Sequence, residues 1–340
     1  MSPKFEVVVA DFLTEAEIEE PILAPIARII LAGATHEDDL APLLPTADAL
    51  ILYHDVASVS DASFAIAPRC RVIVRAGVGY NNVDLEAAEA RGILVCNVPD
   101  YGSEEVADHA IMMLLAIARH LRDSDNSLRA GQWDYTVARA TPRLRGKTLG
   151  IVGCGRIGTA TALRAKAFGM DVIFHDPHVV PGQDKALGIR RAWSLEELLS
   201  QSDFVSLHCY LDDSTRHLIN SRTLPLMRPG SILINTARGP VIEPNALLEA
   251  LDSGHLLGAG LDVFEVEPLD NERLRHHPSV LLTPHSAFYS LEGFVELRRK
   301  TAEEVARVLR GEAPLNPVSL AMHGGQRRRS AASVTRGLQS

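Results

Sequence analysis

Residues 149–158 read Leu-Gly-Ile-Val-Gly-Cys-Gly-Arg-Ile-Gly, and the rest of the chain is organised around them. The apolar run at the start of this stretch predicts a short β-strand. Three glycines, Gly153, Gly155 and Gly158, then predict a tight turn, and residues 160–168 are rich in helix-forming residues. The stretch therefore predicts a strand, a turn and a helix in immediate succession.

If this turn binds a dinucleotide, glycine is required at each of the three positions for a different structural reason. Gly153 permits the turn, Gly155 lets a pyrophosphate approach the backbone, and Gly158 lets the helix pack closely on the strand. The phosphates would meet the free amides of Arg156 and Ile157 at the helix N-terminus, where the helix dipole also favours negative charge. A GxGxxG pattern alone is a weak signal, so the alternative is a glycine-rich turn that binds no nucleotide.

An acidic residue after the next strand favours the dinucleotide. Residues 171–175 (Asp-Val-Ile-Phe-His) predict a second strand, and Asp176 follows it, 18 residues beyond Gly158. A carboxylate at this place binds the ribose hydroxyls of NAD and repels the extra phosphate of NADP. The sequence therefore predicts NAD as the cofactor. NADP is the less favoured alternative, and it stays open because His175 and His178 flank the acid.

Composition restricts the kind of partner. The chain has 340 residues, enough for about two domains, with 46% apolar and 23% charged residues and a net charge of -9. No basic surplus exists to neutralise phosphates, so we expect no nucleic-acid partner. The longest apolar run, residues 110–118, is too short to cross a membrane, and we expect a small-molecule partner.

Cysteine usage indicates the compartment. The four cysteines form no CxxC pair and lack the spacing of a zinc site, so we predict no metal site; they are Cys70, Cys96, Cys154 and Cys209. Reduced thiols and the lack of an evident export signal predict a cytoplasmic protein. Cys154 lies in the glycine loop, where a packed side chain is the favoured interpretation and a redox-sensitive thiol the alternative.

The first hundred residues predict a smaller α/β domain with a parallel sheet, because five apolar runs alternate with more polar segments. These runs are 5–10, 26–31, 49–52, 72–74 and 93–95. A helix is expected to begin at Thr14, an N-cap residue followed by acids. At the end of the fourth run, Arg75 and the amides of Val78 and Gly79 can hold a small carboxylate. The alternative is that Arg75 pairs with a structural acid.

The remainder predicts a six-stranded doubly wound sheet with a C-terminal helix. Apolar runs at 204–207, 231–235, 257–263 and 280–282 join the two strands around the glycines. Helices are expected at 104–121, 195–199, 215–227, 244–251 and 291–310, and an irregular arm at 123–144. Residues 321–340 predict a disordered tail, with a basic arm as the alternative.

Three polar residues follow strands of this sheet and can converge at its carboxyl edge. They are Arg238, Glu267 and His285. A guanidinium holds a carboxylate at two points, an imidazole transfers a proton near neutral pH, and a carboxylate orients the imidazole. This is a complete set for reducing a 2-oxo acid. His285 taken alone is more often structural, and Glu265 is a rival for the carboxylate role.

The sequence resembles the D-isomer-specific 2-hydroxyacid dehydrogenases over residues 5–318, and is most similar to the branch that contains the C-terminal binding proteins. The resemblance is carried by the glycine motif, the three polar residues and five further stretches. These are Arg69-Cys-Arg71, Val95-Cys-Asn-Val-Pro99, Leu163-Arg-Ala-Lys-Ala-Phe-Gly169, Ser206-Leu-His-Cys209 and Thr283-Pro-His-Ser-Ala-Phe-Tyr-Ser290.

The resemblance implies an α/β fold in which a Rossmann cofactor domain, residues 104–286, is inserted into a smaller flavodoxin-like substrate domain, residues 1–103 and 287–320. It also implies a homodimer. His285 would protonate the substrate carbonyl, Glu267 would set the imidazole tautomer, and Arg238 would bind the carboxylate. The implied cofactor contacts outside the glycine loop are His208, Thr236, Ala237 and Asp262.

Two departures from the corepressor relatives concern the substrate. Phe288 stands where they carry a tryptophan, and Val78 replaces a serine. The leading hypothesis is an NAD-dependent D-2-hydroxyacid dehydrogenase acting on a small 2-oxo or 2-hydroxy acid, such as glyoxylate, hydroxypyruvate or a phosphoglycerate-like compound. The alternative is an NAD(H)-binding, corepressor-like protein that recruits peptides.

Overall fold

The computed structural model describes residues 4–319, which form two compact units. One unit comprises the described residues up to Tyr101 together with those from Leu291, and the other is Gly102–Ser290. The assignment of the two as substrate and cofactor domains, and the predicted boundaries at 103/104 and 286/287, stay predictions. The predicted tail, 321–340, lies outside the described residues.

The first unit contains a six-stranded sheet. Its strands are β1 (Phe5–Val9), β2 (Ala27–Leu31), β3 (Ala49–Leu52), β4 (Val72–Arg75), β5 (Leu94–Asn97) and β13 (Pro317–Val318). The first five are parallel in the order β2-β1-β3-β4-β5, which is the flavodoxin-like order and confirms the predicted fold. The two-residue β13 is antiparallel to β5 and was not predicted, because it is too short to show a pattern.

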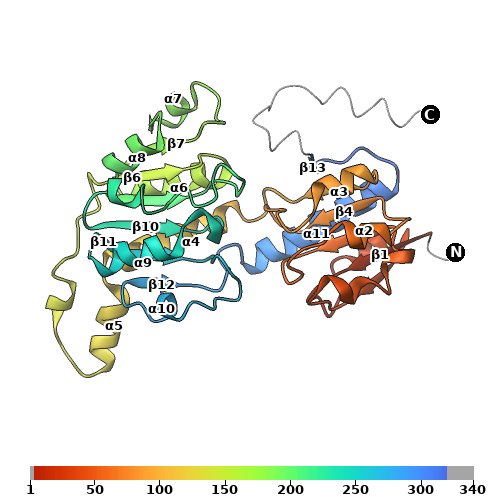
Figure 1. The fold of residues 1–340 in the computed structure, drawn as a ribbon, viewed down its shortest axis with the longest axis horizontal. Helices are drawn as coiled ribbons and strands as arrows, with labels where there is room; N and C mark the ends of the chain where they lie inside the picture. Colours follow the sequence, from red (N-terminus) through yellow and green to blue (C-terminus); the bar gives the residue numbers. More distant parts are fainter. Residues whose placement is uncertain (1–3, 320–340) are drawn as a thin grey trace. The chain divides into compact units, whose positions relative to one another are not determined.

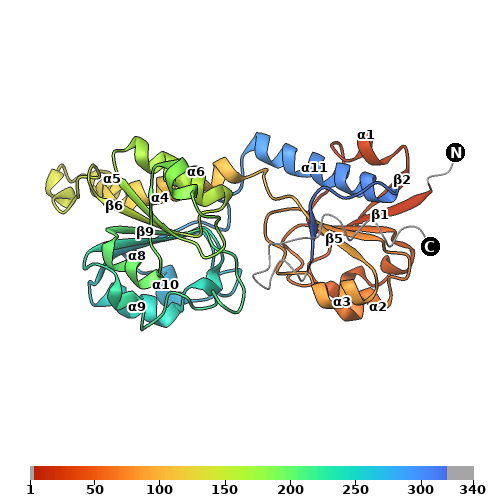
Figure 2. The same ribbon diagram turned by 90° about the horizontal axis from the view of Figure 1, so that it is seen from above.

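Helices cover both faces of this sheet. They are α1 (Glu20–Leu23), α2 (Asp61–Ala65), α3 (Leu85–Ala90) and α11 (Leu291–Leu309), with 3-10 turns η1 (Glu37–Leu40) and η2 (Leu44–Thr46). Figure 2 shows α1 and α11 on one face and α2 and α3 on the other. Because both faces are buried, the strands are continuous apolar runs, and this is why the sequence shows them.

The second unit contains a seven-stranded parallel sheet. Its strands are β6 (Thr148–Val152), β7 (Asp171–His175), β8 (Arg190–Arg191), β9 (Phe204–Leu207), β10 (Ser231–Asn235), β11 (Leu256–Leu261) and β12 (Val280–Leu282). The order β8-β7-β6-β9-β10-β11-β12 is the Rossmann order with one further strand. The predicted count of six was wrong because β8 is a pair of arginines at the edge, with no apolar run.

Helices flank this sheet too, as Figures 1 and 2 show. They are α4 (Ser103–Ala118), α5 (Leu121–Arg129), α6 (Arg156–Ala167), α7 (Gln183–Leu187), α8 (Leu195–Gln201), α9 (Pro244–Asp252) and α10 (Glu272–Arg275), with η3 (Tyr135–Ala138), η4 (Leu224–Leu226) and η5 (Gly239–Val241). In Figure 2, α4 and α6 lie on one face and α8 and α9 on the other, each over its own apolar cluster.

The helix expected from Thr14 was wrong: helix α1 begins only at Glu20. Arg298 of α11 donates to the main-chain oxygen of Glu15 at 2.8 Å, so that oxygen is bonded to a side chain rather than to a helix amide. The same guanidinium also binds Glu17 and the fully buried Glu19. A long-range ion pair therefore overrides the local helix signal.

The helix expected over 215–227 was also wrong, since η4 is its only helical turn. Side chains of Thr215 and Asn220 bond to nearby backbone groups, an alternative to helical pairing. His217 has a φ of +48°, which an α-helix does not allow.

The arm expected to be irregular contains the helix α5. Apart from Leu121 and Leu128 its residues are polar, and none is buried, so no apolar stripe marked it in the sequence. His120, with φ +51°, separates it from α4, so that the helix predicted over 104–121 ends at Ala118. In Figure 1, α5 projects from the rest of the second unit.

Candidate active site

The glycine loop joins β6 to α6 and has the close contacts that its glycines predict. Gly153 has a φ of +89°, and a Cβ on it would lie 2.7 Å from the backbone of His208. A Cβ on Gly158 would lie 2.1 Å from the Gly153 oxygen, which is a direct overlap, whereas a Cβ on Gly155 would meet nothing within 4 Å. The loop is thus closely packed except at Gly155, the helix N-cap, where a ligand can approach.

Cys154 is buried in this loop. Burial raises the pKa of its thiol, despite a contact with the Thr159 hydroxyl. The neutral thiol is a poor nucleophile, and the structure favours the packed interpretation over the redox-sensitive one.

Asp176 lies at the carboxyl end of β7 and contacts the glycine loop. Its Oδ2 accepts the Cys154 amide at 2.8 Å and its Oδ1 accepts the His178 amide at 2.8 Å. Arg191, which sequence reasoning missed, donates to the main-chain oxygen of Asp176 at 3.0 Å and lies over the ring of the exposed Trp193. An acid and a cation therefore flank the place predicted for the adenosine ribose.

Two predicted cofactor contacts carry unused polar atoms. Among the described residues, Thr236 Oγ1 and His208 Nδ1 are buried and find no hydrogen-bond partner. The other ring nitrogen of His208 is bonded to Ser206 Oγ at 2.8 Å, and burial lowers the pKa of His208 to about 3. Buried unpaired polar atoms are rare in folded proteins, so these two, of which His208 contacts the glycine loop at Gly153, fit a dinucleotide.

His285 and Glu267 form a hydrogen-bonded pair. His285 Nδ1 lies 2.7 Å from Glu267 Oε2, and Glu267 Oε1 accepts the Phe264 amide at 2.9 Å. His285 also has a φ of +50°, a conformation that costs a residue with a side chain about 1–2 kcal/mol.

Arg238 lies on the turn that follows β10. A Cβ on Gly239 would lie 1.8 Å from the Phe264 carbonyl carbon, so these two loops touch and only glycine fits between them. The positive charge of Arg238 acts to lower the pKa of Glu267, so the two side chains interact. Hence the three predicted catalytic residues, Arg238, Glu267 and His285, come together from three separate loops.

Glu267 stays ionised although it is partly buried. Burial acts to raise its pKa, but the hydrogen bond and charge of His285, the Phe264 amide and the charge of Arg238 together lower the pKa below its ordinary value. Its rival Glu265 instead pairs with His217 at 3.2 Å and with Arg216 at 3.2 Å. Of the two glutamates, Glu267 is the one that contacts His285.

Asp262 has both carboxylate oxygens bonded within the protein. It is 1% exposed, and it accepts the Thr283 hydroxyl at 2.6 Å and the amides of Ser286 and Ala287 at 2.9 and 3.0 Å. Its contact with a nicotinamide stays a prediction, and the structure gives it a second role in holding the segment around His285. His109 of α4 lies 3.8 Å from the same carboxylate and was missed; a lone imidazole in an apolar helix was its only signal.

The loop of Arg75 belongs to the first unit. Arg75 folds back to donate to the Ala76 oxygen at 2.9 Å, and a Cβ on Gly77 would overlap its guanidinium. The Asn97 side chain holds the Val78 oxygen at 2.7 Å. Binding of a substrate carboxylate by Arg75, Val78 and Gly79 stays a prediction.

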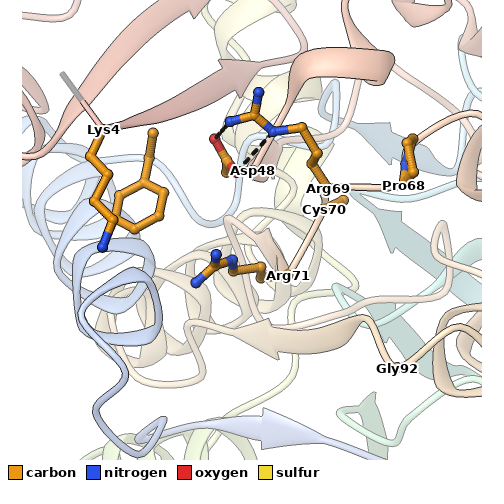
Figure 3. A pocket seen from close by; sticks show the side chains of 8 residues that line it. Lys4, Asp48, Pro68, Arg69, Cys70, Arg71 and Gly92 are labelled. Carbon is orange, nitrogen blue, oxygen red and sulfur yellow. Dashed lines mark hydrogen bonds and ion pairs between the residues drawn. The ribbon is translucent and has the colours of Figure 1, made fainter. Parts of the chain in front are cut away.

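A hollow of about 470 Å³ in the first unit contains none of the predicted site residues. It lies at the amino ends of β1, β3 and β4, the opposite edge from Arg75. Figure 3 shows Lys4, Arg69 and Arg71 around it, with Arg69 paired to Asp48 at 2.8 Å. The described residues also contain no cluster of three His, Cys, Asp or Glu side chains placed to hold a metal, and no helix long and apolar enough to cross a membrane.

Comparison with known proteins identifies the class. Residues 111–287 match the family model described as D-isomer specific 2-hydroxyacid dehydrogenase, NAD binding domain. A glyoxylate reductase of Thermococcus litoralis is 42% identical over 262 residues, 74% of this chain and 78% of that protein. A D-3-phosphoglycerate dehydrogenase of Methanocaldococcus jannaschii is 36% identical over 315 residues, 93% of this chain and 59% of that longer protein. The crystal structure of a glyoxylate reductase from Paecilomyes thermophila has a TM-score of 0.85 at 28% identity, covering 94% of this chain and 99% of that one.

The chain belongs to the D-isomer-specific 2-hydroxyacid dehydrogenases. It is accordingly an NAD-dependent oxidoreductase that acts on CH–OH groups of 2-hydroxy acids. The predicted likeness to the C-terminal binding protein branch stays a prediction.

Proposed function

We propose that the protein reduces a small 2-oxo acid of the glyoxylate or hydroxypyruvate type with NADH. The observation that carries this is the 2.7 Å bond between His285 and Glu267, close to Arg238 on the adjoining loop. The relatives named as glyoxylate reductases support a two-carbon or three-carbon substrate.

Each of the three residues has a distinct task in this reaction. Arg238 binds the substrate carboxylate and polarises the adjacent carbonyl, since a guanidinium matches a carboxylate with two parallel hydrogen bonds. His285 donates a proton from Nε2 to the carbonyl oxygen. Glu267 holds Nδ1, which fixes the tautomer and the plane of the ring. Bound NADH supplies the hydride.

We propose further contacts on the substrate side. Arg75 and the amides of Val78 and Gly79 would bind the carboxylate, as their place at the end of β4 supports. The Phe288 ring lies edge-on to the His285 ring, 6.3 Å between centroids, and is an apolar group next to the proton donor.

A panel of 2-oxo acids with NADH tests the proposal. We expect kcat/KM to be highest for glyoxylate or hydroxypyruvate and at least about tenfold lower for 2-oxo acids with long or branched side chains, because those crowd the site. The measurement is NADH consumption at a fixed cofactor concentration. No turnover on any member of the panel would contradict the proposal.

NAD selection is proposed to depend on Asp176. Replacing Asp176 by Ala removes the charge that repels a 2′-phosphate, while Arg191 remains to attract it. We expect the ratio of kcat/KM for NADH to that for NADPH to fall by about tenfold or more. Asp171→Ala is the matched control, because Asp171 is an exposed acid at the opposite end of β7. An unchanged ratio in the Asp176 variant would remove this residue from cofactor selection.

We also propose a cytoplasmic homodimer. The projecting arm of α5 and η3 exposes large apolar side chains: Leu121, Leu128, Trp133 and Tyr135. An exposed apolar group of this kind is typical of a protein interface, which supports the homodimer. The four cysteines are free thiols, as expected in a reducing compartment, which supports the cytoplasm. Sedimentation should give twice the mass of one chain.

A further inference from the structure

Helix α4 contacts the segment that carries His285 at two points. His109 Nε2 lies 3.0 Å from Thr283 Oγ1, two residues before His285. Ser290 Oγ donates to Glu105 Oε1 at 2.8 Å, five residues after it. Residues four apart in a helix share a face, so one face of α4 holds both ends of the segment.

The direction of the first contact follows from hydroxyl chemistry. Thr283 has one hydroxyl proton, which it donates to Asp262 Oδ1 at 2.6 Å. It can therefore only accept from His109, and His109 must carry a proton on Nε2. Burial lowers the pKa of His109, against the opposing charge of Asp262, so the donor is a neutral imidazole of defined tautomer.

The hydrogen-bonded chain ends on the backbone around His285. Asp262 accepts the amides of Ser286 and Ala287 through its two carboxylate oxygens, and its main-chain oxygen accepts the His285 amide at 2.8 Å. These bonds surround the residue whose φ is +50°. A strained conformation persists only when its surroundings hold it from several sides, and here Asp262 supplies three of the bonds that do so.

We propose that His109 is a positioning residue of the reaction: through Thr283 and Asp262 it holds the backbone of His285 where the imidazole meets both Glu267 and the substrate. His109 touches neither substrate nor cofactor in this role. The inference rests on the proposed role of His285 and adds a residue on a helix more than 150 positions earlier in the chain.

Four single variants and one double variant test the positioning role. His109→Leu removes the donor and Thr283→Val removes the hydroxyl, and each is expected to lower kcat by about tenfold. The double variant should lower kcat by no more than the larger single effect, because both changes break one chain of bonds. His109→Gln keeps an N–H donor at a similar reach and should keep kcat within about threefold of the wild type. Thr283→Ser keeps the hydroxyl and should do the same.

The affinity for NADH and a control variant separate positioning from a general loss of structure. The dissociation constant of NADH, read from its fluorescence, should stay within about twofold in every variant, so that the loss lies in kcat. His255→Leu is the matched control. His255 directly precedes β11 and is a half-buried imidazole whose Nε2 is hydrogen-bonded to the main-chain oxygen of Leu224. It should lower the melting temperature as His109→Leu does but leave kcat unchanged.

The outcomes that overturn the inference are specific. The inference is overturned if folded His109→Leu or Thr283→Val keeps full kcat. It is also overturned if the losses add in the double variant, or if His109→Gln loses as much kcat as His109→Leu. If His109→Leu does not fold, the Thr283→Val and Thr283→Ser pair carries the test alone. A wild-type protein without turnover would instead overturn the proposed function, so the two failures are distinguishable.

Discussion

The His285→Gln variant is expected to reduce glyoxylate with kcat lowered by about a thousandfold, while its dissociation constant for NADH stays within about twofold of the wild type. Glutamine can keep a hydrogen bond to Glu267, but its amide has no proton to release to a carbonyl near neutral pH. The loss therefore falls on the chemical step. Steady-state NADH consumption and NADH fluorescence measure the two quantities.

The chain offers a close control for this variant. His217 also has a positive φ, +48°, and its ring also lies beside a glutamate, with 3.2 Å between Nε2 and Glu265 Oε2. His217→Gln should keep kcat within about threefold of the wild type, because the proposed proton transfer does not involve it. Equal losses in the two variants would mean that the His285 effect is structural.

The Arg238→Gln variant is expected to lower kcat/KM for a 2-oxo acid by about a thousandfold, because it loses both the charge that binds the carboxylate and the polarisation of the carbonyl. Arg238→Lys should lie between this variant and the wild type, since an ammonium group keeps the charge without the two-pronged geometry. KM should rise and kcat should fall in both.

The control for Arg238 is Arg216→Gln. Arg216 pairs with Glu265 at 3.2 Å on the surface nearby, so it tests the loss of a nearby positive charge alone. We expect a change of less than about threefold in kcat/KM. If Arg238→Gln kept activity within tenfold of the wild type, the carboxylate would have to be bound elsewhere.

The inner strands could be predicted because they lie buried between two helical layers, so that their residues form apolar runs. The site followed from the same fact: carboxyl ends of parallel strands share an edge, which brings Glu267 and His285 together from different loops. The Rossmann and flavodoxin-like types of the two sheets also followed from motif and family likeness, and they are confirmed.

What could not be predicted depends on contacts distant in sequence or on elements without an apolar face. Arg298 displaces the expected helix near Glu15 from the other end of the chain, and β8 consists of arginines alone. His109 contacts Thr283 from 174 positions away. No local pattern marks any of these, because each is defined by its partner in space rather than by its own spacing.

The first unit is completed by the far end of the chain, and this affects the order of folding during synthesis. The strands β1 to β5 leave the ribosome early, but Glu19 cannot be buried as an ion pair until Arg298 has been made. The second unit is continuous, so it can fold while the early strands wait without α11. During that interval a nascent chain exposes a sheet face that the finished protein covers, and this is the stage at which a chaperone has an apolar surface to bind.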